Sequence, residues 1–118
     1  MKETNNSLIE SVGNGKIQYK GKWYEKSLII GIDKIIYPWK HPDVADLDIS
    51  DFETVFDGNT EVILLGTGAK QVFPDGYLLN KILTKGVGIE VKDTISACRT
   101  FNLLVSEYRR PLAMLMLE

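Results

Sequence analysis

The residues best placed to do chemistry lie where a predicted buried strand, 61–65, ends in the turn Gly66-Thr67-Gly68. In an open α/β sheet, ligands bind at the carboxyl ends of the strands. Two glycines at such a place let backbone N–H groups approach an anionic group closely. The turn therefore predicts a small-ligand or anion site in which the N–H groups of Thr67 and Gly68 hold the anion. The structural alternative is that the glycines only permit a tight exit from the strand.

The turn does not complete a known phosphate-binding motif. It lacks the third glycine of the dinucleotide fingerprint and the Gly-Lys-Ser/Thr ending of a P-loop, although Lys70 is close. Arg99, off the core stripe of a predicted helix, is a candidate partner for an anion beside Gly66. The alternative for Arg99 is a solvated charge with a packed stem.

Other reactive residues give weaker patterns. Cys98 and His41 suggest a nucleophile and its base, but nothing in the sequence brings them together, and a lone cysteine beside a helical core stripe is usually a small buried hydrophobe. The acid-rich segment 43–53 fails as an EF-hand, because a loop starting at Asp46 has Asp51 where glycine is needed. We therefore assign no catalytic residue, no metal site and no cofactor.

The first half of the chain predicts a β meander. Strands are expected at 7–12, 16–19 and 23–32, with a possible extension to 34–37. Turns at 13–15 and 20–21 separate the first three, since Asn and Gly tolerate positive φ. A capping box, Ser50 with Glu53, then predicts a short helix that begins at Ser50.

The second half predicts a βαβ pattern. The apolar run 61–65 is typical of a strand buried on both faces. A helix is expected from 74 or 75 to 85, followed by a capping glycine, Gly86. A strand at 87–91, a helix to about Glu107 and a final strand at 111–117 follow. The short crossover implies that strands 61–65 and 87–91 pair in parallel.

Composition favours one soluble domain. The chain has 118 residues, a net charge of −2, 44% hydrophobic and 25% charged residues, which fits a single domain over 1–118 with a flexible tail at 1–6. A single cysteine and the absence of a signal sequence favour the cytoplasm. The longest apolar runs are five or six residues, so no membrane span is expected. The sequence pI of about 5.4 argues against nucleic-acid binding.

Four segments in a fixed order resemble a known family. They are 63–68 (ILLGTG), 71–74 (QVFP), 88–94 (GIEVKDT) and 97–104 (ACRTFNLL). Together they resemble a small α/β domain family of uncertain function. The family includes the mitochondrial NADH:ubiquinone oxidoreductase complex assembly factor 3 and the adipogenesis-associated Mth-domain protein. The resemblance covers about residues 8–118.

The resemblance implies a three-layer (β+α/β/α) fold around a central mixed five-stranded sheet, with the last strand, 111–117, antiparallel to the rest. It implies no established catalysis, and a role in assembling a membrane enzyme complex through protein contacts. The chain departs from the family at Lys92, where methionine is frequent, and at Tyr108, where glycine is common. It also lacks a mitochondrial presequence. The family positions that match give the candidate ligand-binding set: Gly66, Thr67, Gly68, Gln71, Phe73, Arg99 and Asn102.

Two functions remain in competition. The first is a non-catalytic protein-interaction or assembly module whose contacts with a partner include Tyr37 and Trp39, aromatic residues outside the regular pattern. Those aromatics have a structural alternative, covering the open face of the meander. The second is a small-molecule or anion-binding domain, with possible weak enzyme activity at the Gly66 turn. The sequence favours the first and leaves the oligomeric state open.

Overall fold

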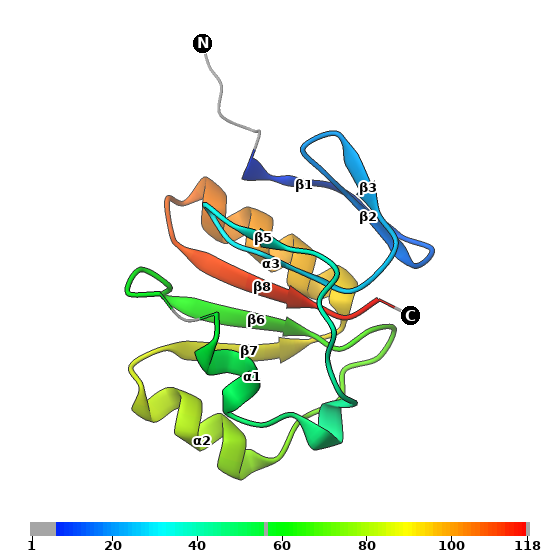
Figure 1. Ribbon diagram of the computed structural model, residues 1–118. Helices are drawn as coiled ribbons and strands as arrows, with labels where there is room; N and C mark the ends of the chain where they lie inside the picture. Colours follow the sequence, from blue (N-terminus) through cyan, green and yellow to red (C-terminus); the bar gives the residue numbers. More distant parts are fainter. Residues whose placement is uncertain (1–6, 56, 118) are drawn as a thin grey trace.

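Within residues 7–55 and 57–117, the protein is built from a large sheet, a small sheet and three α-helices (Figure 1). The computed structural model describes residues 7–55 and 57–117; residues 1–6, expected as a tail, lie outside them. The elements are, in chain order, β1 (Ile9–Gly13), β2 (Lys16–Tyr19), β3 (Lys22–Tyr24), β4 (Leu28–Ile30), β5 (Ile35–Ile36), the 3₁₀ helix η2 (Val44–Asp46), α1 (Ser50–Glu53), β6 (Val62–Gly66), α2 (Gly76–Thr84), β7 (Gly88–Lys92), α3 (Thr94–Ser106) and β8 (Pro111–Leu115).

The large sheet has the strand order β5-β4-β8-β6-β7. The predicted parallel pairing of β6 with β7 is confirmed, with Val62 opposite Gly88 and Leu65 opposite Val91. The mixed five-stranded sheet is confirmed as well. The predicted direction of the last strand is wrong, because β8 pairs in parallel with β6. The strand that runs against its neighbours is β4, which is antiparallel to both β8 and β5. Helix α3 returns the chain to the starting end of the sheet, so β8 enters in the same direction as β6 and β7.

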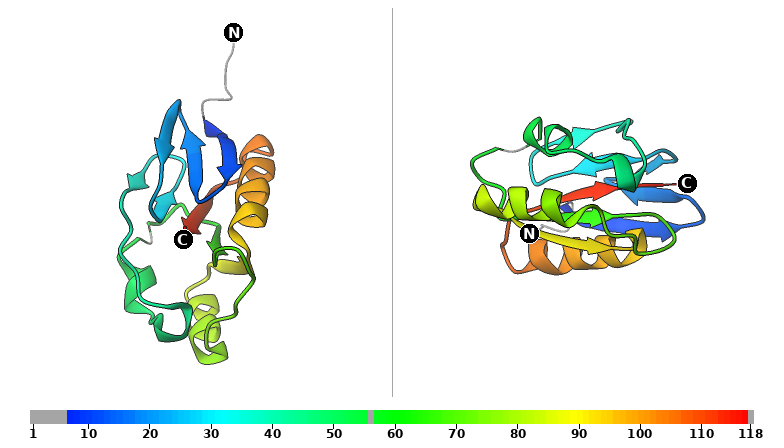
Figure 2. Two further views of the ribbon diagram at one scale, coloured as in Figure 1. Left: turned by 90° about the vertical axis from the view of Figure 1, so that its right-hand side faces the viewer. Right: turned by 90° about the horizontal axis from the view of Figure 1, so that it is seen from below.

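Each face of the large sheet has its own hydrophobic core, which produces three layers (Figure 2). In β6, Ile63 and Leu65 pack in the core beneath α1 and α2, and Leu64 packs in the core beneath α3 and the small sheet. This alternation follows from the two-residue period of a strand. The near-continuous apolar sequence of β6 is thus explained by burial on both faces.

The small sheet is a meander with the order β1-β2-β3. Its two turns, Asn14-Gly15 and Lys20-Gly21, have positive φ at both residues, as two-residue hairpin turns of type I′ require. The predicted long strand 23–32 is wrong, since β3 pairs with β2 in the small sheet and β4 pairs with β8 in the large one. Residues 25–27 connect the two sheets.

Aspartates begin the two longer helices. Asp75 accepts a hydrogen bond from the N–H of Tyr77, and Asp93 accepts one from Ser96, so each satisfies a free N–H of its first turn. The predicted capping role of Ser50 is wrong: α1 has Ile49 at its N-cap position. The carboxylate of Asp51 instead accepts the N–H of Asp48, two residues earlier than expected.

Candidate functional site

Gly66, the last residue of β6, lies under the first turn of α3. A Cβ atom at Gly66 would lie 2.9 Å from the Cα atom of Thr94 and 3.2 Å from the Cβ atom of Ala97. Real Cβ atoms do not approach backbone this closely, so glycine is required here for helix–sheet packing. The requirement agrees with the structural alternative raised by the sequence.

Thr94 links the carboxyl ends of two neighbouring strands, β6 and β8, by hydrogen bonds. Its hydroxyl accepts the N–H of Gly68 at 2.8 Å and donates to the carbonyl of Met116 at 2.7 Å. The N–H of Thr94 donates to the carbonyl of Gly68 at 2.9 Å. Because Thr94 is buried, these bonds satisfy polar groups that water does not reach. No role beside the turn was predicted for Thr94; its place at the start of the helix after strand 87–91 was the available signal.

Thr67 and Gln71 hold the loop that follows the turn. The N–H of Thr67 donates to the carbonyl of Lys92, and the Thr67 hydroxyl accepts the N–H of Val72 at 2.9 Å. The hydroxyl also donates to the carbonyl of Lys70. The side-chain amide of Gln71 donates to the carbonyl of Val91 at 2.9 Å, a group at the outer edge of the sheet. The loop is therefore fixed to β7 by its own side chains.

These contacts change the interpretation of the Gly66 turn. The N–H groups of Thr67 and Gly68, which the sequence assigned to an anion, already donate to Lys92 and to Thr94. Neither group is free to bind a ligand without breaking a buried hydrogen bond. The anion-holding arrangement expected from the sequence is therefore not the one that the structure has.

The fixed loop presents an apolar surface, formed by Val72, Phe73 and Tyr77 and called here the Phe73 surface. All three side chains are exposed, Phe73 by 63%. Between them Pro74 is buried, so the loop is anchored beneath its exposed residues. Exposed aromatic side chains on a fixed backbone are well suited to binding a protein, since little freedom is lost on contact.

A pocket of about 280 Å³ lies next to the turn. Gly68, Ile95 and Met116 line one part of it, and Asn14 and Lys16 of the small sheet line another. Lys16 is the charged residue in this lining, and the hydroxyl of Thr94, which also contributes, is already bonded. The lining is mainly apolar and backbone.

Arg99 and Asn102 take different places. Arg99 is exposed. The hydrogen bond from the Ser96 N–H is the main cause that holds the pKa of the Asp93 carboxyl below its ordinary value, and the positive charge of Arg99 lowers it further. Asn102, expected in the ligand-binding set, contacts the backbone of the small sheet instead. Its carboxamide accepts the N–H of Ile9 at 2.7 Å and donates to the Ile9 carbonyl at 2.9 Å, which joins α3 to the small sheet.

The two aromatic residues predicted to contact a partner also differ. Trp39 is 8% exposed and belongs to the core beneath α1 and α2, so its expected role as a surface anchor is wrong. Tyr37 is exposed and packs edge-to-face on Tyr24, with ring centroids 4.7 Å apart. A partner contact by Tyr37 stays a prediction.

Cys98 and His41 do not form a catalytic pair. Burial raises the pKa of the Cys98 thiol to about 12, and the charge of Asp93 adds to the shift, so the thiol is protonated at neutral pH. The ring of His41 instead contacts the Ser27 hydroxyl at 2.9 Å and the Pro42 carbonyl at 2.8 Å. Within residues 7–55 and 57–117, no group of three acidic, histidine or cysteine side chains could hold a metal ion.

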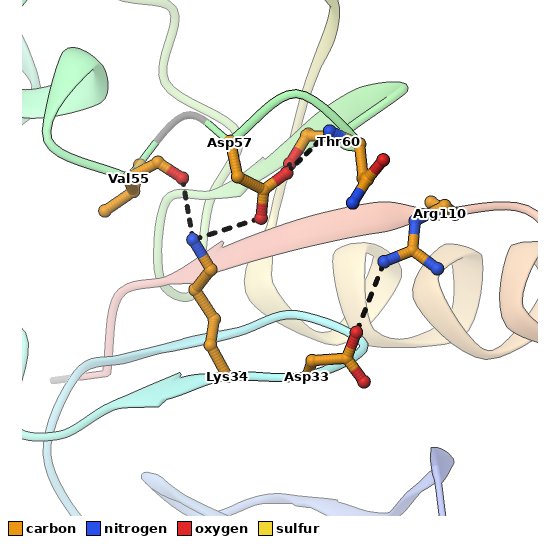
Figure 3. A network of polar contacts seen from close by, with 7 residues as sticks. Asp33, Lys34, Val55, Asp57, Thr60 and Arg110 are labelled. Atoms are coloured by element: carbon orange, nitrogen blue, oxygen red, sulfur yellow. Dashed lines mark hydrogen bonds and ion pairs between the residues drawn. The ribbon is translucent and has the colours of Figure 1, made fainter.

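A charged network closes the opposite end of the sheet (Figure 3). Lys34 contacts the Asp57 carboxylate at 3.3 Å and donates to the Val55 carbonyl at 3.1 Å, while Arg110 contacts Asp33 at 3.4 Å. The N–H of Asn59 is the main cause that lowers the pKa of Asp57. The charges are paired and hold connecting segments together, so we interpret the network as structural.

The fold of this chain recurs in known proteins. A family model described as a protein of unknown function (DUF498/DUF598) matches residues 9–116. The chain belongs to the DUF498/DUF598 family. No established activity comes with this membership, which agrees with the resemblance noted from the sequence.

Two relatives illustrate the range of the DUF498/DUF598 family. The 13 kDa major membrane protein of Francisella tularensis is 33% identical over 87 residues, which are 73% of this chain and 71% of the relative. NADH dehydrogenase [ubiquinone] 1 alpha subcomplex assembly factor 3 of Xenopus tropicalis is 35% identical over 80 residues, or 66% of this chain. That match spans 44% of the length of the assembly factor.

Solved structures confirm the family fold. An NMR structure of a Xanthomonas campestris protein has a TM-score of 0.82 at 30% identity, covering 93% of this chain and 83% of that one. A Mth938-like domain of Bordetella pertussis has a TM-score of 0.79 at 23% identity, covering 98% and 89%. In the part of the DUF498/DUF598 chain that the structure describes, no helix has the length and apolar character needed to cross a bilayer.

Proposed function

We propose that this protein is a non-catalytic interaction module that assists assembly of a protein complex, and that it binds its partner through the Phe73 surface. The exposure of Phe73 on a loop fixed by Thr67 and Gln71 is the observation that carries the proposal. The Xenopus relative is an assembly factor, which supports the same class of function.

The loop is rigid where it contacts the sheet and apolar where it faces solvent. Val72 and Phe73 are neighbours in the loop, and Tyr77 is the second residue of α2; all three side chains are exposed to a partner. Aromatic residues in such clusters supply a large share of binding energy at protein interfaces. An apolar cluster on a fixed loop is costly to leave in water and is typical of an interaction site.

The groups that could take part in catalysis are buried or already hydrogen-bonded. The Cys98 thiol is buried and its pKa is raised, and the donors of the Gly66 turn are engaged. These facts favour binding over nucleophilic catalysis or stabilisation of an oxyanion. The engaged N–H groups of Thr67 and Gly68 argue against the anionic ligand considered from the sequence. The cytoplasmic location stays a prediction.

The test uses native mass spectrometry and quantitative co-purification from the cell that makes the protein. Phe73→Ser should reduce the recovery of a stoichiometric partner at least tenfold, since loss of a buried aromatic anchor commonly costs 2 kcal/mol or more. Leu103→Ser is the matched control, because Leu103 is 57% exposed on α3 and lies outside the Phe73 surface. Equal recovery with the two variants would refute the proposed surface.

A further inference from the structure

Two segments of the chain differ strongly in charge, although the net charge of the chain is only −2. Residues 16–26 hold four lysines and a single acid, Glu25, whereas residues 43–53 hold five acids and no basic residue. The first segment covers the face of the large sheet that α3 covers, since Ile17 packs in that core. The second packs on the other face through Phe52. The basic segment and the acidic segment therefore pack on opposite faces of the large sheet (Figure 2).

The small sheet and the segment after it carry exposed lysines and one exposed tryptophan; Lys22, which pairs with Tyr19, lies on the opposite side of β3 from Trp23. We call this set the lysine face; it consists of Lys16, Lys20, Lys22, Lys26 and Trp23, and all five side chains are exposed. Trp23 is 46% exposed and lies opposite Gln18 on β2, on the side of the small sheet that faces away from the core. The small sheet lies at the outside of the molecule, next to α3 (Figure 1).

Three of these lysines are held over aromatic rings. The ammonium group of Lys16 is 5.1 Å from the ring centroid of Trp23, that of Lys20 is 5.6 Å from Tyr19, and that of Lys22 is 5.5 Å from Tyr24. Such contacts restrict long side chains that are otherwise mobile. The positive charges are therefore fixed on the face, and their ordering costs little when an anionic surface approaches.

The same contacts decide which anionic partner fits. Single-stranded nucleic acid binds by stacking its bases on open aromatic faces, but here lysines lie over the rings and Tyr19 and Tyr24 are buried. A membrane surface needs no stacking. It offers many phosphate groups to separate point charges, and tryptophan is the side chain enriched at the membrane–water interface.

We infer that the lysine face docks this protein on the surface of an anionic phospholipid bilayer, with the lysines contacting lipid phosphates and Trp23 entering the headgroup region. The acidic segment 43–53 then faces away from the membrane, which orients the molecule. Tyr77 of α2 lies across the large sheet from the lysine face, since α2 packs in the other core. The Phe73 surface therefore stays accessible, and the two proposals are independent.

The test measures sedimentation of the purified full chain with vesicles of phosphatidylcholine that contain 40% phosphatidylglycerol. We expect binding that weakens as salt is raised, and much less binding to vesicles of phosphatidylcholine alone. Equal binding to both kinds of vesicle would overturn the inference. So would full release from the anionic vesicles by an equimolar single-stranded oligonucleotide, because the lysines would then prefer nucleic acid.

Two triple variants distinguish the effect of where the lysines lie from the effect of the net charge on binding to vesicles. Lys16→Gln, Lys20→Gln and Lys22→Gln together should lower the partition onto anionic vesicles about a hundredfold. Lys70→Gln, Lys81→Gln and Lys85→Gln together change the net charge equally and should retain most of the binding. The control also removes a lysine held over a ring, since the Lys81 ammonium is 4.8 Å from the centroid of Tyr77. Equal losses in both triple variants would refute the lysine face.

Tryptophan fluorescence locates the contact. Trp39 is buried, so a blue shift or quenching by brominated lipid on adding anionic vesicles should come from Trp23. Trp23→Phe should abolish that change while sedimentation with the vesicles persists. Binding without any change in Trp23 emission would show that another face meets the membrane.

Discussion

Asn102 binds both backbone polar groups of Ile9 with a single side chain. Its carboxamide oxygen accepts the N–H at 2.7 Å and its amide nitrogen donates to the carbonyl at 2.9 Å. The two residues are 93 positions apart. The pair replaces the neighbouring strand that β1 lacks on this edge of the small sheet, and so it fixes the small sheet, with its lysine face, to α3.

Replacing Asn102 with alanine should therefore weaken this attachment. We expect a loss of about 2 kcal/mol in the free energy of unfolding, because two hydrogen bonds disappear and the partly buried groups of Ile9 lose their partner. Urea denaturation measures the loss, and hydrogen exchange of the Ile9 amide should accelerate. Asn102→Asp keeps the hydrogen-bond acceptor but loses the donor. Its free energy of unfolding should therefore be lowered at neutral pH and recover in acid, where a protonated carboxyl can donate to the Ile9 carbonyl. Identical stability of all three proteins would contradict the role of the pair.

Gly66 offers a second test, because its role is packing against Thr94. Gly66→Ala places a methyl group 2.9 Å from the Thr94 Cα atom, and we expect destabilisation of about 1–3 kcal/mol, as for other overpacked cores. Thermal and urea unfolding give the value. The matched substitution is Gly76→Ala at the start of α2, where nothing lies within 4 Å of the new Cβ atom. It should leave stability unchanged or raise it slightly, and equal effects at the two positions would reject the packing argument.

Much of the second half of the fold was predictable from the sequence. The period of apolar residues and the capping residues gave β6, α2, β7 and α3 within one or two positions, because these signals are local. The direction of β8 was not predicted correctly, since it depends on pairing with β6 far away in the sequence. The break between β3 and β4 was missed for the same reason: each strand takes its register from a different sheet.

The sequence placed the Gly66 turn correctly, but not its hydrogen bonding. The sequence located the Gly66 turn at the end of a buried strand, as the structure does. It could not show that Thr94 and Lys92, more than 20 residues away, occupy the N–H groups of Gly68 and Thr67. Whether a donor is free depends on tertiary contacts, which a local motif does not encode. The exposure of Phe73 depends in the same way on the loop being fixed by Thr67.

Tyr108 provides a prediction in the stabilising direction. It follows α3 with a φ of 63°, and the N–H groups of Tyr108 and Arg109 donate to the carbonyls of Val105 and Leu104, the pattern of a Schellman cap. Glycine suits this position, and the tyrosine side chain is 95% exposed, so little contact is lost. Tyr108→Gly should raise the free energy of unfolding by about 0.5–1 kcal/mol. Calorimetry or urea denaturation can measure the gain, which Tyr108→Ala should lack because alanine keeps the strain at positive φ.

The burial of Cys98 predicts that the free energy of unfolding falls at alkaline pH. Its thiol has a pKa of about 12 in the folded protein and 9.0 as the ordinary value, mainly because of burial. Because the folded-state pKa is raised, the stabilising contribution of the protonated Cys98 thiol to the free energy of unfolding is fully present below pH 9. It is lost as the pH rises towards 12, because the unfolded chain releases its thiol proton first. Cys98→Ala removes this ionisation. The difference in the free energy of unfolding between the wild type and Cys98→Ala should therefore shift by about 1 kcal/mol against the wild type between pH 8.5 and 10. Urea denaturation of both proteins across this range provides the measurement, and a constant difference would show that the thiol ionises as readily in the folded protein as in the unfolded chain.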